Sequence, residues 1–273
     1  MNLIAHPFLS VLLTLLAVWL VLNALSPFLV NQAMFHPQPA SYPKDHAGVR
    51  LIRDAGGNIS AYWMKARKPN GKTILISHGN GEDFGNWFDR FAMFNRLGFN
   101  VLSYDYPGYG YSEGKPTETG VYRAADAAYR YLTDTLRVKP SDLILYGYSI
   151  GTGPSCYLTE RYPVAGLIFH SGFYSAPQVV TRRRILWIDP FPNGKRLRTI
   201  ACPKLFLHGR EDRIVPFAQG CRAYEAAAEP KTPIWVEDAN HYTIEEHMGF
   251  GKYEEAIRRF ALGLALEQEE NAR

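Results

Sequence analysis

The chain of 273 residues lacks the net charge typical of nucleic-acid-binding proteins and the cysteine spacing typical of metal sites. Its formal net charge of +4 is small and scattered, so we expect no nucleic-acid partner. Its three cysteines, Cys156, Cys202 and Cys221, lack the spacing of a metal site, and we expect buried or unreactive thiols and no bound metal. The remaining composition, 47% hydrophobic and 21% charged, is typical of a globular protein with a large core.

Charge of either sign is absent from the start of the chain, because no Lys, Arg, Asp or Glu precedes Lys44. Within this stretch, residues 8–30 form an apolar run of about 23 residues, long enough to cross a bilayer core as a helix. A cleaved signal peptide is the alternative, but it would need a basic start, a shorter apolar run and a small-x-small cleavage site. We therefore expect a retained single-pass membrane anchor. Arg50 and Arg53 weakly favour a cytoplasmic catalytic domain, and the side of the membrane stays open.

Composition divides the chain into four parts: an anchor at 1–30, a Pro-rich linker at 31–47, a catalytic domain at 48–266 and a tail at 267–273 that we expect to fray. Eight short runs in the third part are predicted strands, at 49–53, 59–65, 73–77, 100–104, 143–146, 166–170, 204–208 and 234–237. Helical stretches alternate with them, at 87–97, 122–136, 150–162, 217–228 and 253–266. The first two strands have the pattern of a hairpin, and the alternation predicts a doubly wound, mostly parallel sheet with helices on both faces.

Residues 143–153 read LILYGYSIGTG, which is an apolar strand followed by Gly-x-Ser-x-Gly and the small residues of a helix start. This pattern places Ser149 at the apex of a sharp strand-to-helix turn. Side chains two positions before and after it would collide there, which explains Gly147 and Gly151. The turn exposes the hydroxyl near a helix N-terminus, where developing negative charge is favoured. A plain Gly-rich turn is the alternative, and the strand and helix on either side favour a nucleophile.

Two later loops supply an acid and a base. Ligands of such sheets bind outside the carboxyl ends of the strands, and both Asp212 and His241 follow predicted strands. Chain order is therefore Ser149, Asp212, His241, as in α/β-hydrolases. A serine hydroxyl needs a base to take its proton, an imidazole suits that task, and a carboxylate fixes the imidazole tautomer. Glu211 and Asp238 are the competing carboxylates. Asp238 lies only three residues from His241, a spacing that rarely allows carboxylate–imidazole geometry in a turn, and of the adjacent pair Glu211 and Asp212 we assign Asp212.

The sequence HGNG at 78–81 follows another buried strand and can turn backbone N–H groups outward. The N–H groups of Asn80 and of Ile150, directly after Ser149, are the candidate oxyanion hole. A phosphate-binding loop is the alternative, but the Gly-Lys-Ser/Thr of such loops does not follow.

From about residue 48 to 265, the chain resembles the α/β-hydrolase superfamily. The segments HGNG, SYDYPGYGYSEGKPTE, YGYSIG, LHGREDRIVP and ANHY stand in the order and spacing of that family. More narrowly, the chain is similar to small membrane-anchored abhydrolase-domain proteins related to the prolyl-oligopeptidase and serine-aminopeptidase lineages. These pair an N-terminal anchor with a catalytic domain that has little or no cap. The resemblance implies an α/β-hydrolase fold in which Ser149 is the nucleophile, Asp212 the acid and His241 the base, with Asn80 and Ile150 as backbone donors.

The resemblance is a poor guide to substrate. Eukaryotic relatives include protein depalmitoylases, but ANHY departs from the pattern of many relatives, which have Gly before the histidine and Asn or Asp after it. We expect a membrane-anchored serine hydrolase without cofactors, acting on a small-molecule or lipid-linked acyl ester or thioester. A serine peptidase or aminopeptidase is one alternative, and the lack of a propeller or large cap counts against it. A non-catalytic binding protein on the same fold is the other, and the presence of all three triad candidates counts against it.

Two further segments bear on substrate. Residues 171–201 form the only sizeable insertion and carry one acid, Asp189, against six basic residues: Arg182, Arg183, Arg184, Lys195, Arg196 and Arg198. This segment is either a solvated basic face or a contact with anionic lipid. Four tyrosines crowd the loop after the strand at 100–104: Tyr104, Tyr106, Tyr109 and Tyr111. They either line an acyl pocket or pack a loop rich in Gly and Pro.

Overall fold

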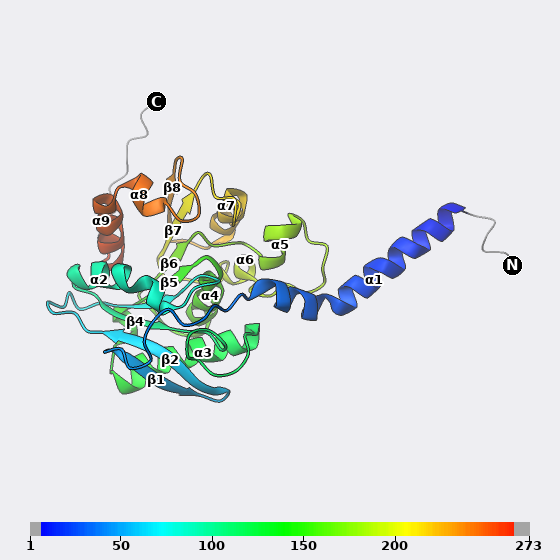
Figure 1. Cartoon of the computed structure of the whole chain (residues 1–273). Coiled ribbons are helices and arrows are strands. Elements are labelled where there is room, and N and C mark those ends of the chain that lie inside the picture. The colour runs from blue at the N-terminus through cyan, green and yellow to red at the C-terminus, as the bar shows by residue number, and fades with distance from the viewer. Residues whose placement is uncertain (1–6, 265–273) are drawn as a thin grey trace, which may run out of the picture.

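The computed structural model describes residues 7–264 (Figure 1). All eight predicted strands are present and form one sheet in the order β1-β2-β4-β3-β5-β6-β7-β8. The first two pair antiparallel as the predicted hairpin, β2 and β4 are also antiparallel, and every other pair is parallel. The strands are β1 (Val49–Asp54), β2 (Gly57–Met64), β3 (Thr73–Ser77), β4 (Asn100–Tyr104), β5 (Leu143–Tyr148), β6 (Gly166–His170), β7 (Lys204–Gly209) and β8 (Lys231–Val236).

Helices cover both faces of the sheet, because the strands bury alternate side chains on opposite sides. Ile74 and Ile76 of β3 join a core with α2 (Phe88–Arg96) and α9 (Phe250–Ala261). Leu75, between them, joins a second core on the other face. That core contains side chains of α3 (Glu118–Arg130), α4 (Thr152–Arg161) and α7 (Phe217–Ala226). The predicted doubly wound architecture is therefore confirmed.

Three short helices were not predicted, since four to six residues leave too little periodicity to read. They are α5 (Ala176–Thr181) and α6 (Asn193–Arg196), both within the insertion, and α8 (Ile244–Met248). With only these two short helices, the insertion forms no separate cap domain, in line with the resemblance.

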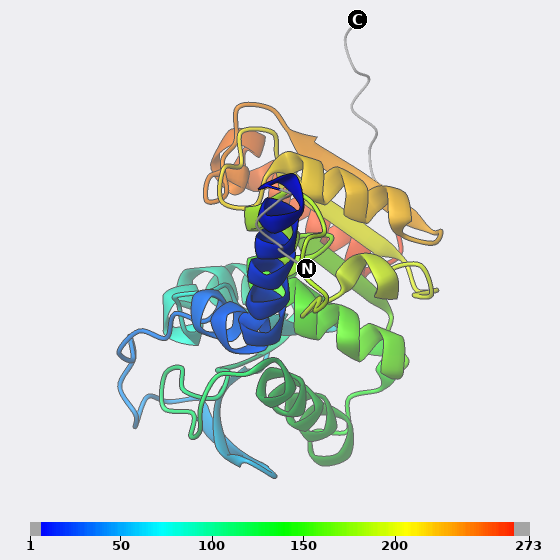
Figure 2. The same ribbon diagram turned by 90° about the vertical axis from the view of Figure 1, so that its right-hand side faces the viewer.

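The N-terminal helix α1 (Pro7–Met34) is the one helix in the described part of the chain that is long and apolar enough to cross a membrane. Its first half stands away from the sheet, whereas its second half lies beside α5 and the loop that follows it (Figures 1 and 2). Asn23 and Ser26, in this second half, are buried. The helix also ends four residues later than the anchor expected at 1–30.

The segment after α1 is not the free spacer that its proline content indicated. Phe35 and Tyr42 are buried, and the Tyr42 hydroxyl lies 2.6 Å from Asp105 Oδ2 and 2.8 Å from Ser60 Oγ. The backbone N–H of Ser41 donates to Asp83 Oδ2 at 2.7 Å. The sequence did not indicate this docking, because isolated aromatic side chains hold the segment in place and leave no periodic pattern. The expected tail at 267–273 lies outside the described residues.

Removal of one hydroxyl tests this docking. Tyr42→Phe deprives the buried Asp105 carboxyl of a partner, so we expect it to lower the free energy of unfolding by about 1–3 kcal/mol. Tyr111→Phe is the matched control, because Tyr111 is 38% exposed, and its effect should stay below about 0.5 kcal/mol. Urea unfolding of the detergent-solubilised chain measures both changes. Equal effects of the two variants would mean that the hydroxyl of Tyr42 does not hold the segment.

Candidate active site

Ser149 lies at the turn between β5 and α4 and is buried. Its φ of 52° is in the left-handed region, which a residue with a side chain adopts only where its surroundings enforce it. A Cβ on Gly147 would lie 2.7 Å from the carbonyl oxygen of Gly151. A Cβ on Gly151 would overlap the carbonyl oxygen of Ser77 and lie 2.6 Å from that of His78. These close approaches bear out the steric reason predicted for the two glycines.

The loops after β7 and β8 bring a carboxylate and an imidazole together at the carboxyl edge of the sheet. Asp212 Oδ2 lies 2.7 Å from His241 Nδ1, and both side chains are buried. The N–H groups of Ile214 and Val215 donate to Asp212 Oδ1 at 2.9 and 2.8 Å. On the other side, the Tyr148 hydroxyl donates to the carbonyl oxygen of His241 at 2.8 Å. Both partners of the pair are thus held by hydrogen bonds of their own.

The surroundings of Asp212 keep its carboxylate charged. Burial alone would raise the pKa of Asp212, but hydrogen bonds from His208 and His241 and the charges of both imidazoles lower that pKa to about 2. His208 Nε2 lies 3.3 Å from Asp212 Oδ2 and 2.9 Å from the carbonyl oxygen of Val215. His208 is not among the predicted site residues. Its position near the end of β7, beside the acid, was the signal that could have found it.

The competing carboxylates lie apart from the imidazole. Glu211 and Asp238 are exposed, and of the three carboxylates considered, Asp212 is the one hydrogen bonded to His241. Within residues 7–264, no hydrogen bond joins Ser149 Oγ to His241. Such contacts in hydrolases are often long until substrate binds, so the geometry is compatible with a triad.

Asn80 and Ile150 belong to two loops that touch each other, because the elbow glycine Gly151 packs on the end of β3. The Asn80 side chain is tied to the chain that leaves α1. Its Nδ2 donates to the carbonyl oxygen of Met34 at 2.9 Å, and its Oδ1 accepts from the N–H of His36 at 3.0 Å and from the Tyr109 hydroxyl at 2.7 Å. The end of α1 therefore positions the loop whose backbone is the candidate oxyanion donor.

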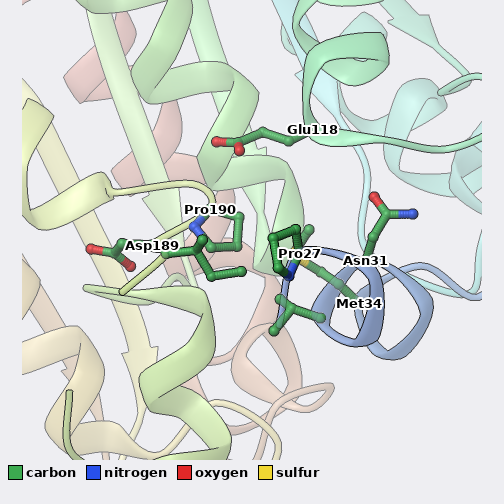
Figure 3. A pocket seen from close by; sticks show the side chains of 8 residues that line it. Pro27, Asn31, Met34, Glu118, Asp189 and Pro190 are labelled. Atoms are coloured by element: carbon green, nitrogen blue, oxygen red, sulfur yellow. The ribbon is translucent and has the colours of Figure 1, made fainter. Parts of the chain in front are cut away.

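A pocket of about 300 Å³ lies between α1 and the insertion. Figure 3 shows Pro27, Asn31 and Met34 of α1 on one side and Asp189 and Pro190 on the other. Its lining consists of Pro27, Val30, Asn31, Met34, Glu118, Ile188, Asp189 and Pro190. Neither Ser149 nor His241 lines this pocket, but the backbone of Met34 connects it to Asn80.

Comparison with known proteins decides the family. A family model described as the alpha/beta hydrolase fold matches residues 72–188. Alpha/beta hydrolase domain-containing protein 17B of Homo sapiens is 37% identical over 227 residues, which cover 82% of this chain and 78% of that protein. The chain belongs to the α/β-hydrolase family. Alpha/beta hydrolase domain-containing protein 17C of Mus musculus is 38% identical over 214 residues, which cover 77% of this hydrolase and 65% of the mouse protein.

Solved structures agree with this fold. The esterase Pf2001 of Pyrococcus furiosus superimposes with a TM-score of 0.68 at 16% identity, covering 84% of this α/β-hydrolase and 96% of the esterase. An esterase from Exiguobacterium antarcticum superimposes with a TM-score of 0.62 at 15% identity, over 78% and 98% of the two chains. These superpositions show the fold. The family match and the similarity to protein 17B make the protein a hydrolase, and its fold implies a small-molecule substrate. Among residues 7–264, no group of three or more His, Cys, Asp or Glu side chains has the arrangement of a metal site.

Three of the four tyrosines near the site pack against the loops around it. Tyr104, Tyr106 and Tyr109 are buried, and the Tyr106 hydroxyl donates to the carbonyl oxygen of His78 at 2.6 Å. Together with the bond from Tyr109 to Asn80, this contact fixes the loop after β3. These contacts favour the packing interpretation for the three buried tyrosines, whereas Tyr111, the fourth, is 38% exposed.

The contact between Asp212 and His241 predicts which carboxylate matters in this hydrolase. Asp212→Asn should reduce kcat by about 10³–10⁴-fold, since an amide favours the wrong imidazole tautomer. Glu211→Gln and Asp238→Asn should leave kcat nearly unchanged, because both side chains are exposed and neither contacts His241. Turnover of a p-nitrophenyl ester measures all three variants, with circular dichroism as the check on folding. A larger loss in either control variant than in Asp212→Asn would overturn the assignment of the acid.

Proposed function

We propose that this hydrolase is a membrane-anchored serine hydrolase that cleaves an acyl ester or thioester through an acyl-enzyme on Ser149. The hydrogen-bonded pair of Asp212 and His241, at the same sheet edge as the left-handed Ser149, is the observation that carries the proposal. In the domain organisation that we propose, α1 is the anchor and the chain from 35 onward is the catalytic unit.

The proposed reaction needs no cofactor. Ser149 Oγ attacks the acyl carbonyl carbon while His241 takes the hydroxyl proton, and Asp212 stabilises the resulting imidazolium. The tetrahedral oxyanion accepts hydrogen bonds from the backbone N–H groups of Asn80 and Ile150. Collapse expels the alcohol or thiol, which receives the proton from His241. Water, deprotonated by the same imidazole, then attacks the acyl-enzyme, and the acid is released as Ser149 recovers its proton.

The pocket between α1 and the insertion supports an acyl substrate. Much of its lining is apolar, from Pro27, Val30, Met34, Ile188 and Pro190. Its two carboxylates already have partners elsewhere. Glu118 Oε1 accepts from the Tyr122 hydroxyl and from the N–H of Phe191, and Asp189 Oδ1 accepts from the Ser175 hydroxyl. In the proposal, the acyl chain runs from the elbow past Met34 into this pocket, whose volume is at the lower end of the range for ligand sites.

Covalent labelling tests the nucleophile. A fluorophosphonate probe should label the wild-type protein, and Ser149→Ala should abolish labelling because the attacking hydroxyl is gone. His241→Ala should retain the fold and lower kcat by at least roughly a thousandfold, because the base that activates Ser149 is lost. Ser141→Ala, at an exposed position, is the control and should label normally. Labelling that persists in Ser149→Ala would contradict the proposal.

Acyl-chain length tests the pocket. Val30→Trp fills space between α1 and the insertion, so kcat/KM for long-chain acyl thioesters should fall about tenfold or more, while kcat/KM for acetyl esters stays the same. Phe28→Trp is the control, since Phe28 is exposed and does not line the pocket. A uniform loss across all chain lengths in Val30→Trp, or a profile like that of Phe28→Trp, would place the acyl chain elsewhere.

A further inference from the structure

Helix α1 is bound along its second half to the loop that follows α5. Trp19 Nε1 donates to the carbonyl oxygen of Ile185 at 3.1 Å, and the backbone N–H of Trp187 donates to Asn23 Oδ1 at 2.8 Å. The rings of Trp19 and Trp187 meet edge to face with centroids 5.1 Å apart. Toward its C-terminal end, the helix also donates from Asn31 Nδ2 to the carbonyl oxygen of Pro116 at 3.2 Å.

This attachment sets how much of α1 remains to cross a bilayer. The twelve residues from Pro7 to Val18 precede the first of these contacts and cover about 18 Å at the rise of an α-helix. A hydrocarbon core is about 30 Å thick and needs about 20 helical residues. An α1 that crosses the core therefore carries Trp19 and Asn23 to membrane depth, and the loop bonded to them goes with it.

We propose that residues 180–188, the end of α5 and the loop that follows it, here called the docking loop, enter the membrane beside α1, so that helix and loop form one lipid-facing surface. The proposal rests on the membrane anchoring proposed above for α1. Three large apolar side chains of the docking loop are exposed: Val180 at 83%, Ile185 at 52% and Trp187 at 56%. These exposed apolar side chains adjoin the exposed apolar helix α1. An exposed apolar surface of this kind indicates that it contacts another apolar surface.

The polar groups of the docking loop suit the same environment. Irregular backbone is tolerated in a membrane only where its N–H and C=O groups find partners within the protein. The side chains of Trp19 and Asn23 supply such partners to the carbonyl oxygen of Ile185 and the N–H of Trp187. Asn23, a polar residue in the middle of an apolar helix, is only 3% exposed, and this contact explains its presence.

The charged residues of the docking loop favour lipid headgroups. Arg182, Arg183 and Arg184 are all exposed, and their long side chains can keep the guanidinium at the phosphate level while the stem lies in the apolar zone. Arg196, further along the insertion, behaves differently, because it is half-buried and pairs with Glu160 at 3.1 Å. Arg196 therefore does not belong to a solvated face, whereas the three adjoining arginines directly precede Ile185, whose carbonyl oxygen is bonded to α1.

The docking loop also brings the pocket to the membrane. Ile188, its last residue, lines the pocket together with Val30 of α1. An acyl chain in the outer part of the bilayer would thus reach the pocket without crossing water. The proposed occupant of this surface is accordingly the lipid bilayer. Quenching measurements distinguish it from a second copy of the chain.

Depth measurements on the full-length chain in vesicles of phosphatidylcholine and phosphatidylglycerol test the proposal. Cys202→Ser and Cys221→Ser leave the buried Cys156, and single cysteines then replace Ile185, Val11 or Leu51 for labelling with a fluorophore. Leu51 is the matched control, because it lies on β1, at the edge of the sheet, and is 58% exposed, close to Ile185. Quenching by a lipid-borne nitroxide and by aqueous iodide is recorded at each position, and fluorophosphonate labelling verifies that each variant is folded.

We expect the labels at 185 and 11 to be quenched several-fold more strongly by the lipid nitroxide than the label at 51, and to be shielded from iodide. If the label at 185 is quenched like the one at 51 while the label at 11 is quenched by lipid, the proposal that the docking loop enters the membrane is overturned. The proposal that α1 is an anchor then stands. If the label at 11 is also quenched like the one at 51, both the membrane entry of the docking loop and the anchoring by α1 are overturned. Shielding of 185 from both quenchers indicates a second copy of the chain and also overturns the proposal.

Discussion

The close approach of the elbow to the end of β3 is the contact on which the rest of the site depends. Gly151 packs so tightly on the carbonyl groups of Ser77 and His78 that no side chain fits between them. This packing holds Ser149 in its left-handed conformation and seats Ile150 beside the loop that contains Asn80. The proposed nucleophile and both candidate oxyanion donors therefore owe their positions to one backbone contact, which a single methyl group would disrupt.

The sheet itself could be predicted from the sequence because its central strands are buried on both faces. Runs such as Thr73–Ser77 and Lys204–Gly209 are flanked by turns and helices, and the carboxyl ends of parallel strands meet at one edge. That rule predicts that Asp212 and His241, which follow β7 and β8, lie at the same edge. The docking of Tyr42 could not be predicted, because Tyr42 and Asp105 are distant in the sequence and no local pattern records their contact. His208 is only four residues from Asp212, but His78 and His170 also lie near strand ends, so position alone did not single out His208. Short helices such as α5 also carry too few turns to show a period.

As the proposed membrane anchor, helix α1 has two functions that place different demands on its residues. An anchor needs apolar side chains facing lipid, whereas a domain element needs polar partners, and α1 separates these needs along its length. Its first half is exposed and apolar, while its second half carries Asn23 and Asn31, which bond to the catalytic domain. The carbonyl oxygen of Met34 then holds the Asn80 side chain. Anchoring and the geometry of the candidate oxyanion hole are thus mechanically linked in the proposed enzyme.

Trapping of the acyl-enzyme tests the central claim most directly. The purified hydrolase is mixed briefly with a medium-chain acyl thioester, quenched in acid and digested, and the peptides are analysed by mass spectrometry. The account predicts an added mass equal to one acyl group on the peptide that contains Ser149, and no such mass in Ser149→Ala, because the attacking hydroxyl is gone. Turnover without an adduct on that peptide, or an adduct confined to a cysteine, would contradict it.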